Sequence, residues 1–136
     1  MSAKRFLDTN VLVYAYDLAA PAKRAVALEL VEQSWNNVGE FAISVQVLQE
    51  LHAQLSRRGV AVSDVAQIIR DYAAWPIVEN TVALLIAGLD EQLRWKISFW
   101  DALILAAARA SGATELLSED FSDGQDYGGI RAVNPF

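Results

Sequence analysis

The chain has 136 residues, of which 54% are hydrophobic, so we expect residues 1–136 to form a single domain with a core of its own. It contains no cysteine and one histidine, which excludes disulfide scaffolds, zinc–thiolate sites and thiol nucleophiles and leaves any metal centre to oxygen ligands. The net charge of -6 disfavours broad, charge-driven binding to nucleic acid, although it allows a nuclease whose acids gather in one cleft.

Short apolar runs alternate with helical patterns along the chain. In chain order we predict a strand over 5–8, a short helix or turn over 11–16, a helix over 21–35, a strand over 40–44, helices over 45–58 and 63–74, a strand over 77–79, a helix over 81–95, a helix from 98 to its stop at 112, a strand over 114–118, a loop over 119–129 and a last strand over 130–133. Ser44 and Ser63 are predicted to cap their helices, and Thr81 and Ser98 to begin theirs. The order indicates an α/β fold: a three-layer sandwich with a mostly parallel central sheet of four to five short strands flanked by helices, the last strand at an edge.

Four acids from distant parts of the chain are predicted to meet at the carboxyl edge of this sheet. Asp8 follows the first strand and Asp120 follows the fourth. Glu50 lies in the first turns of the helix that leaves the second strand. Asp101 lies in the first turn of a helix that runs directly into the fourth strand, so this helix must start at the carboxyl edge. In open parallel sheets this edge faces the ligand crevice.

Each of these acids alone has an ordinary structural explanation. Asp8 suits a turn or cap, Asp101 suits a variant capping box with Ser98, Glu50 suits a solvated helix face, and Asp120 suits a polar loop. Their shared location argues against four coincidences. Carboxylates gathered at one edge would repel one another unless a divalent cation compensated them, and hard oxygen ligands favour Mg²⁺ or Mn²⁺. Such ions suit attack on a phosphodiester.

Other polar and aromatic residues receive weaker interpretations. His52 lies two residues from Glu50 and hence on a different helix face, so we interpret it as a structural or surface residue. The tryptophans suit core and interfaces, with Trp100 beside the site as the exception. If RNA binds, the basic residues that are candidates for phosphate contacts are Arg57, Arg58, Arg94 and Lys96, together with Lys23 and Arg24.

The sequence also predicts where the protein works. No apolar run approaches the roughly 18 residues of a membrane span. The first residues, MSAKRFLDTN, reach an acid too soon to form the core of a signal peptide. We therefore expect a soluble cytoplasmic protein without membrane contact.

Four stretches resemble, in this order, the PIN domain, and specifically the VapC-like ribonuclease toxins of prokaryotic toxin–antitoxin pairs: LDTNVLVYAYD, VLQELHAQL, FWDALILAAARASGA and ELLSEDFSDGQ. The resemblance implies a metal-dependent endoribonuclease for single-stranded RNA that uses Mg²⁺ or Mn²⁺. It implies a homodimer and a small cognate antitoxin that blocks the acid cleft. Residues matching the family's metal-binding acids are Asp8, Glu50, Asp101 and Asp120, and residues matching its polar supporting positions are Thr9, Asn10 and Ser118.

One match is ambiguous, because the segment SEDFSDG offers Glu119, Asp120 and Asp123 for the fourth acid. We choose Asp120, since it lies two residues beyond Ser118. Asp123 remains an alternative that shares the role.

Two other functions remain as alternatives. A phosphoacceptor receiver domain is also a small α/β protein with clustered acids and Mg²⁺, but receivers, by resemblance, carry paired acids after the first strand and a lysine after a late one. Here Asp8 is followed by Thr9 and Asn10, and no lysine occurs after Lys96. The other alternative is a PIN fold that binds RNA or protein without cutting, which the presence of all four acids disfavours.

Overall fold

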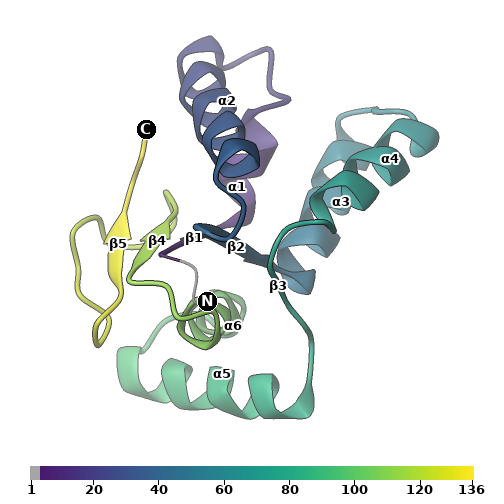
Figure 1. The fold of residues 1–136 in the computed structure, drawn as a ribbon. Helices are drawn as coiled ribbons and strands as arrows, with labels where there is room; N and C mark the ends of the chain where they lie inside the picture. The colour runs from purple at the N-terminus through teal and green to yellow at the C-terminus, as the bar shows by residue number, and fades with distance from the viewer. Residues whose placement is uncertain (1–3) are drawn as a thin grey trace.

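The computed structural model describes residues 4–136, which form a parallel sheet with helices on both faces (Figure 1). The strands are β1 (Arg5–Leu7), β2 (Phe41–Ser44), β3 (Ile77–Val78), β4 (Glu115–Leu117) and β5 (Arg131–Val133). The helices are α1 (Thr9–Tyr14), α2 (Pro21–Asn36), α3 (Val45–Arg57), α4 (Val62–Tyr72), α5 (Val82–Trp95) and α6 (Phe99–Ala110).

The sheet has the strand order β3-β2-β1-β4-β5, and every neighbouring pair is parallel. β1 lies at the centre, where Phe6 and Leu7 are fully buried, because parallel strands need crossover helices that cover both faces of the sheet. The predicted three-layer α/β fold is confirmed, and so is the edge position of β5. The sheet is entirely parallel rather than mostly so.

The helices form two layers around the sheet. In Figure 1, α5 and α6 lie on one side, and α1 to α4 lie on the other. Helix α5 packs closely on α6 at Gly88, where an added Cβ would stand 2.5 Å from the Leu103 Cδ2 atom. None of the helices in residues 4–136 is both long and apolar enough to cross a membrane.

Helix starts agree with the sequence in three cases and differ in one. Ser44 accepts a hydrogen bond from the backbone N–H of Val47 at 3.2 Å, as a cap does, and Thr81 and Ser98 also cap their helices. The predicted cap at Ser63 is wrong. Helix α4 begins at Val62, and its N-cap residue is Ala61. The methyl group of Ala61 accepts no hydrogen bond.

The predicted loop after β4 is confirmed, and it is anchored to the core. Phe121 and Tyr127 are buried with their ring centroids 5.5 Å apart. Arg109 at the end of α6 donates to the backbone carbonyls of Tyr127 and Gly128 at 2.7 and 2.9 Å. This arginine also forms an ion pair with the buried Glu91 of α5 at 2.6 Å. The loop is therefore held in one path over the end of the sheet.

Candidate active site

Asp8 lies where the central strand ends and α1 begins. Its backbone N–H donates to the carbonyl of Leu117 at 3.0 Å, which continues the β1–β4 pairing and brings Ser118 alongside. One carboxylate oxygen, Oδ1, accepts from the Thr9 N–H at 2.7 Å, so Asp8 is the N-cap of α1. The other oxygen, Oδ2, accepts from the Ser118 hydroxyl at 2.7 Å. Only 3% of Asp8 is exposed.

The carboxylate of Asp8 is unusually hard to ionise. Burial raises its pKa to about 7; hydrogen bonds from Ser118 and Thr9 oppose this rise, while the nearby Asp120 and Glu50 add to it. A carboxyl group with this pKa is only partly ionised at neutral pH, and a positive charge close to it would favour the ionised form. The electrostatics therefore suit a site that receives a cation.

Asn10 connects the two chain segments that flank the cleft. Its amide nitrogen lies 3.2 Å from the Ser118 hydroxyl oxygen and 3.1 Å from the Asp120 Oδ2 atom, and more loosely, 3.4 Å, from Asp8. The Asp120 backbone N–H in turn donates to the Ser118 hydroxyl at 3.0 Å. Asp120, although exposed, is thus held beside Asp8.

Glu50 reaches the same place from α3. Its Oε2 atom accepts from the Thr9 hydroxyl at 3.1 Å, and its Oε1 atom accepts from the Gln46 amide at 2.7 Å. The Gln46 amide also donates to the backbone carbonyl of Trp100 at 3.2 Å. Gln46 therefore orients Glu50 and links α3 to the start of α6. Sequence reasoning missed Gln46, although it precedes Glu50 by four residues and hence shares its helix face.

Asp101 completes the set from the first turn of α6. Its backbone N–H donates to the Ser98 hydroxyl at 3.1 Å, as expected for the helix start. Partial burial raises the pKa of the Asp101 carboxyl; hydrogen bonding with Ser98 lowers it, and Asp120 and Glu50 raise it further. The four acids are thus electrostatically coupled.

A polar cleft of about 260 Å³ opens over three of the acids: Asp8, Glu50 and Asp120 line it, and Asp101 does not. In the described part of the chain, no three acidic or histidine side chains stand close enough together to hold one ion as they are. The donor chemistry nevertheless fits a hard divalent cation, because the side chains available there are carboxylates and the one histidine, His52, is exposed.

The three acids offered for the fourth position have different surroundings. Asp120 and Glu119 both line the cleft, and of these two Asp120 accepts a hydrogen bond from the Asn10 amide at 3.1 Å. Asp123 instead accepts a hydrogen bond from the backbone N–H of Asn134 at 2.9 Å. Glu119 accepts from the Tyr14 hydroxyl at 2.6 Å and from Lys23 at 3.0 Å. Burial would raise the pKa of Glu119, but these two hydrogen bonds and the charge of Lys23 lower it overall.

The basic residues proposed for phosphate contacts lie in different places. Arg58 lines the cleft and pairs with Asp17 at 3.3 Å. Arg57, its neighbour, is exposed. At the far end of α5, Arg94 lies over the Trp95 ring with its guanidinium carbon 4.5 Å from the centroid, and Lys96 is exposed beyond it. Of these four residues, the structure brings only Arg58 to the acids.

Comparison with known families decides what kind of domain this is. The sequence model of the PIN domain matches residues 5–122. The chain belongs to the PIN domain family. The fold and the family both agree with the resemblance stated above, and nothing in them supports a receiver domain.

Individual relatives of this PIN domain are VapC proteins. The chain is 26% identical over 141 residues to ribonuclease VapC24 of Mycobacterium tuberculosis strain CDC 1551 / Oshkosh, and the match covers 95% of this chain and 94% of the relative. The resemblance to VapC ribonucleases is therefore confirmed.

Solved structures share the fold. A toxin–antitoxin complex from Klebsiella pneumoniae aligns with a TM-score of 0.70 at 19% identity over 98% of both chains. The Mycobacterium tuberculosis toxin VapC20, which cleaves the sarcin–ricin loop, aligns with a TM-score of 0.64 at 22% identity, covering 86% of this chain and 92% of the other. DNA-bound VapBC from Salmonella typhimurium aligns with a TM-score of 0.68 at 15% identity, covering 98% of this chain and 99% of the other.

Proposed function

We propose that this PIN domain is a metal-dependent endoribonuclease that cleaves single-stranded RNA and serves as the toxin of a toxin–antitoxin pair. The observation that carries the proposal is the buried Asp8 carboxylate, which shares its cleft with Glu50 and Asp120 and has a pKa raised to about 7. Such a carboxyl group is only partly ionised at neutral pH, and a cation beside it would favour the ionised form.

The acids would serve as ligands for Mg²⁺ or Mn²⁺. A divalent cation held there supplies Lewis-acid polarisation of a phosphoryl oxygen and lowers the pKa of water. Thr9 and Gln46 hold the Glu50 carboxylate, and Ser118 and Asn10 fix the side of the cleft that carries Asp8 and Asp120. These hydrogen bonds restrict the rotation of the acidic side chains. The site is therefore preorganised before a metal ion binds.

The surroundings of the cleft support RNA as the substrate. Arg58, at its rim, is about two-fifths exposed and carries the positive charge nearest the acids among the lining residues. Lys23 is held near the cleft by hydrogen bonds to Glu119 and Tyr14, which both line the cleft. The cleft, about 260 Å³, has room for one phosphodiester of an RNA strand.

Two partners follow from the same proposal. An antitoxin is supported by the relatives, since the structures similar to this chain include toxin–antitoxin complexes. A homodimer is supported by a stripe of exposed apolar side chains on α5, which we call the α5 stripe; its members are Val82, Ile86, Leu89 and Leu93, between 39% and 79% exposed. A stripe of this kind on a helix suits burial against a second chain.

The proposal is tested by cleavage of a mixed pool of structured and single-stranded RNA in Mg²⁺, in Mn²⁺ and in EDTA. We expect cutting that requires the metal and is lost in Asp8→Asn and Asp101→Asn. Asp90→Asn, which removes an equal charge from an exposed position on α5, is the matched control and should cut as the wild type does. Cutting that persists in EDTA, or that survives Asp8→Asn, would overturn the metal assignment.

A further inference from the structure

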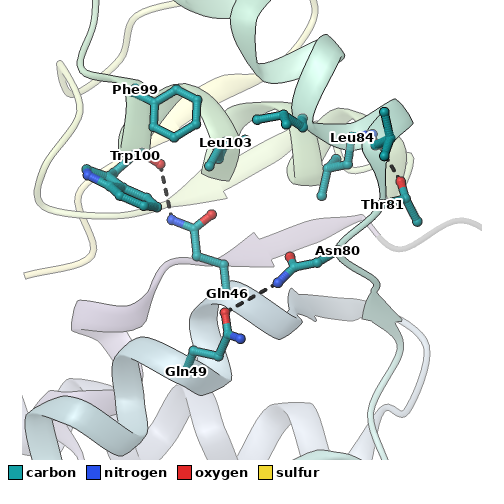
Figure 2. Close-up of a pocket in the computed structure, with 10 residues that line it drawn as sticks. Gln46, Gln49, Asn80, Thr81, Leu84, Phe99, Trp100 and Leu103 are labelled. Carbon is teal, nitrogen blue, oxygen red and sulfur yellow. Dashed lines mark hydrogen bonds between the residues drawn. The ribbon is translucent and has the colours of Figure 1, made fainter.

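A second hollow lies beside the acid cluster, and Figure 2 shows the side chains that form it. It has a volume of about 500 Å³ and runs between the start of α3 and the starts of α5 and α6. We call it the Trp100 groove, and its principal walls are Gln49, Asn80, Leu84, Phe99, Trp100 and Leu103.

The Trp100 groove continues into the region of the acids. A neighbouring hollow of about 500 Å³ shares Gln46, Gln49 and Trp100 with it and is also lined by Glu50. The Gln46 amide joins the two, because it donates both to the Glu50 carboxylate and to the Trp100 carbonyl. Asp101 follows Trp100 directly in α6. A polymer held at the acids would therefore pass along this surface.

The chemistry of the groove suits a flat, uncharged ring. Trp100 is 65% exposed, and the ring of Phe99, 5.1 Å away at an interplanar angle of 68°, does not stack face to face on it, so much of the indole surface is open. Leu84 and Leu103 supply an apolar floor. None of the described residues that line the groove carries a charge, so it has nothing to attract a phosphate.

The rim of the groove offers hydrogen bonds to the edge of such a ring. The Asn80 amide nitrogen donates to the Gln49 Oε1 atom at 3.3 Å (Figure 2). Among residues 4–136, the remaining side-chain polar atoms of this pair, the Gln49 amide nitrogen and the Asn80 amide oxygen, have no hydrogen-bond partner. Both residues are exposed, so a donor and an acceptor stand together above the apolar floor.

We propose that the Trp100 groove binds one unpaired nucleobase of the RNA, next to the phosphodiester held at the acids, with Trp100 stacking on the base and Gln49 and Asn80 contacting its edge. The inference rests on the proposed function and adds the determinant of where the enzyme cuts. Stacking on an aromatic side chain requires an unpaired base, which ties the groove to single-stranded substrate.

A second copy of the chain is the competing occupant, because the α5 stripe begins at Val82, which also lines the groove. A dimer that covered the groove would bury Trp100. Trp100→Ala distinguishes the two occupants. If Trp100 stacks on a base, the substitution changes RNA cleavage; if Trp100 lies in a dimer interface, it changes the oligomeric state.

The test compares the wild type with Trp100→Ala, Trp100→Phe and the control Val62→Ala, which shortens an exposed apolar side chain on α4, outside both the groove and the α5 stripe. Each protein cuts a short single-stranded RNA pool of random sequence in Mg²⁺, and the cut ends are sequenced. We expect Trp100→Ala to lower kcat/KM by about 5- to 150-fold and to flatten the base preference at one position beside the cut. Trp100→Phe should keep most of the activity, because it keeps a stacking ring.

Three further readouts decide the outcome. Gln49→Ala should change which base is preferred while retaining more activity than Trp100→Ala. Light scattering after gel filtration should give Trp100→Ala the same mass as the wild type, and a loss of dimer would overturn the inference in favour of an interface. Unchanged kcat/KM and unchanged base preference in Trp100→Ala, with active wild type, would overturn the inference alone, whereas a wild type that neither cuts nor binds the pool would overturn the proposed function as well.

Discussion

In metal-free protein at neutral pH, the buried Asp8 carboxylate is expected to lower the free energy of unfolding, so Asp8→Asn should raise it. In the unfolded chain this group ionises near 3.8, and in the folded protein it ionises near 7 because burial disfavours the charge. Below pH 3.8 both states are protonated. Between the two values the folded protein keeps a proton that the unfolded chain has lost, so its stability falls as the pH rises.

The size of the effect follows from the two pKa values. The difference between 3.8 and about 7 corresponds to about 4 kcal/mol of stability, lost progressively up to pH 7 and constant above it. The amide of Asp8→Asn cannot accept the Ser118 hydroxyl bond in the same way, which costs about 1 kcal/mol at every pH. The pH dependence separates the two contributions, because only the carboxylate titrates.

The assay is urea unfolding in EDTA at several pH values from 5 to 8, for the wild type, Asp8→Asn and the exposed control Asp90→Asn. The stability of Asp8→Asn relative to the wild type should rise by about 3 kcal/mol from pH 5 to pH 8 and level off above pH 7. Added Mg²⁺ should stabilise the wild type and leave Asp8→Asn unchanged. A relative stability that does not vary with pH would refute the reasoning, since Asp8 would then ionise normally in the folded protein.

Three further substitutions test the contacts around the site. Ser44→Ala removes the cap of α3 and should lower the free energy of unfolding by about 1 to 2 kcal/mol in urea; a loss below about 0.5 kcal/mol would contradict the capping role. Arg109→Met leaves Glu91 buried without its cation and should cost about 2 to 3 kcal/mol, less than a fully buried pair because 35% of the Arg109 side chain is exposed. It should also speed amide exchange in the loop after β4, and unchanged exchange would show that the loop holds itself. Gln46→Ala removes a 2.7 Å donor from Glu50 and should weaken Mn²⁺ binding about 10- to 100-fold by calorimetry, whereas unchanged affinity would show that Gln46 does not orient a metal ligand.

Features set by local sequence were predictable. The caps at Ser44, Thr81 and Ser98 depend on one side chain and the N–H groups that follow it, so the pattern alone identifies them. The same rule failed at Ser63, where Ala61 precedes the helix and the first turn lacks a side-chain cap. Chain direction through the sheet was enough to place Asp8 and Asp101 at one edge.

Features set by long-range contacts were not predictable. The acidic segment after β4 contains three acids, and their different fates depend on the path of the loop, which Arg109 fixes from a distant helix. Glu119 accepts a hydrogen bond from Lys23, and Asp123 accepts one from the backbone N–H of Asn134, just beyond β5. The spacing of residues in the sequence predicts neither contact. The hydrogen bond from Gln46 to Glu50 depends on the side-chain rotamers of both residues. The helix period places the two residues on one face but does not determine these rotamers.

The bonds from Ser118 to Asp8 and from Asn10 to Asp120 each join residues 110 positions apart. The acid cluster therefore exists only when β4 is docked beside β1, because Ser118 and Asp120 follow β4 directly. Any substitution that unpairs β4 from β1 therefore removes the acid cluster together with this part of the sheet.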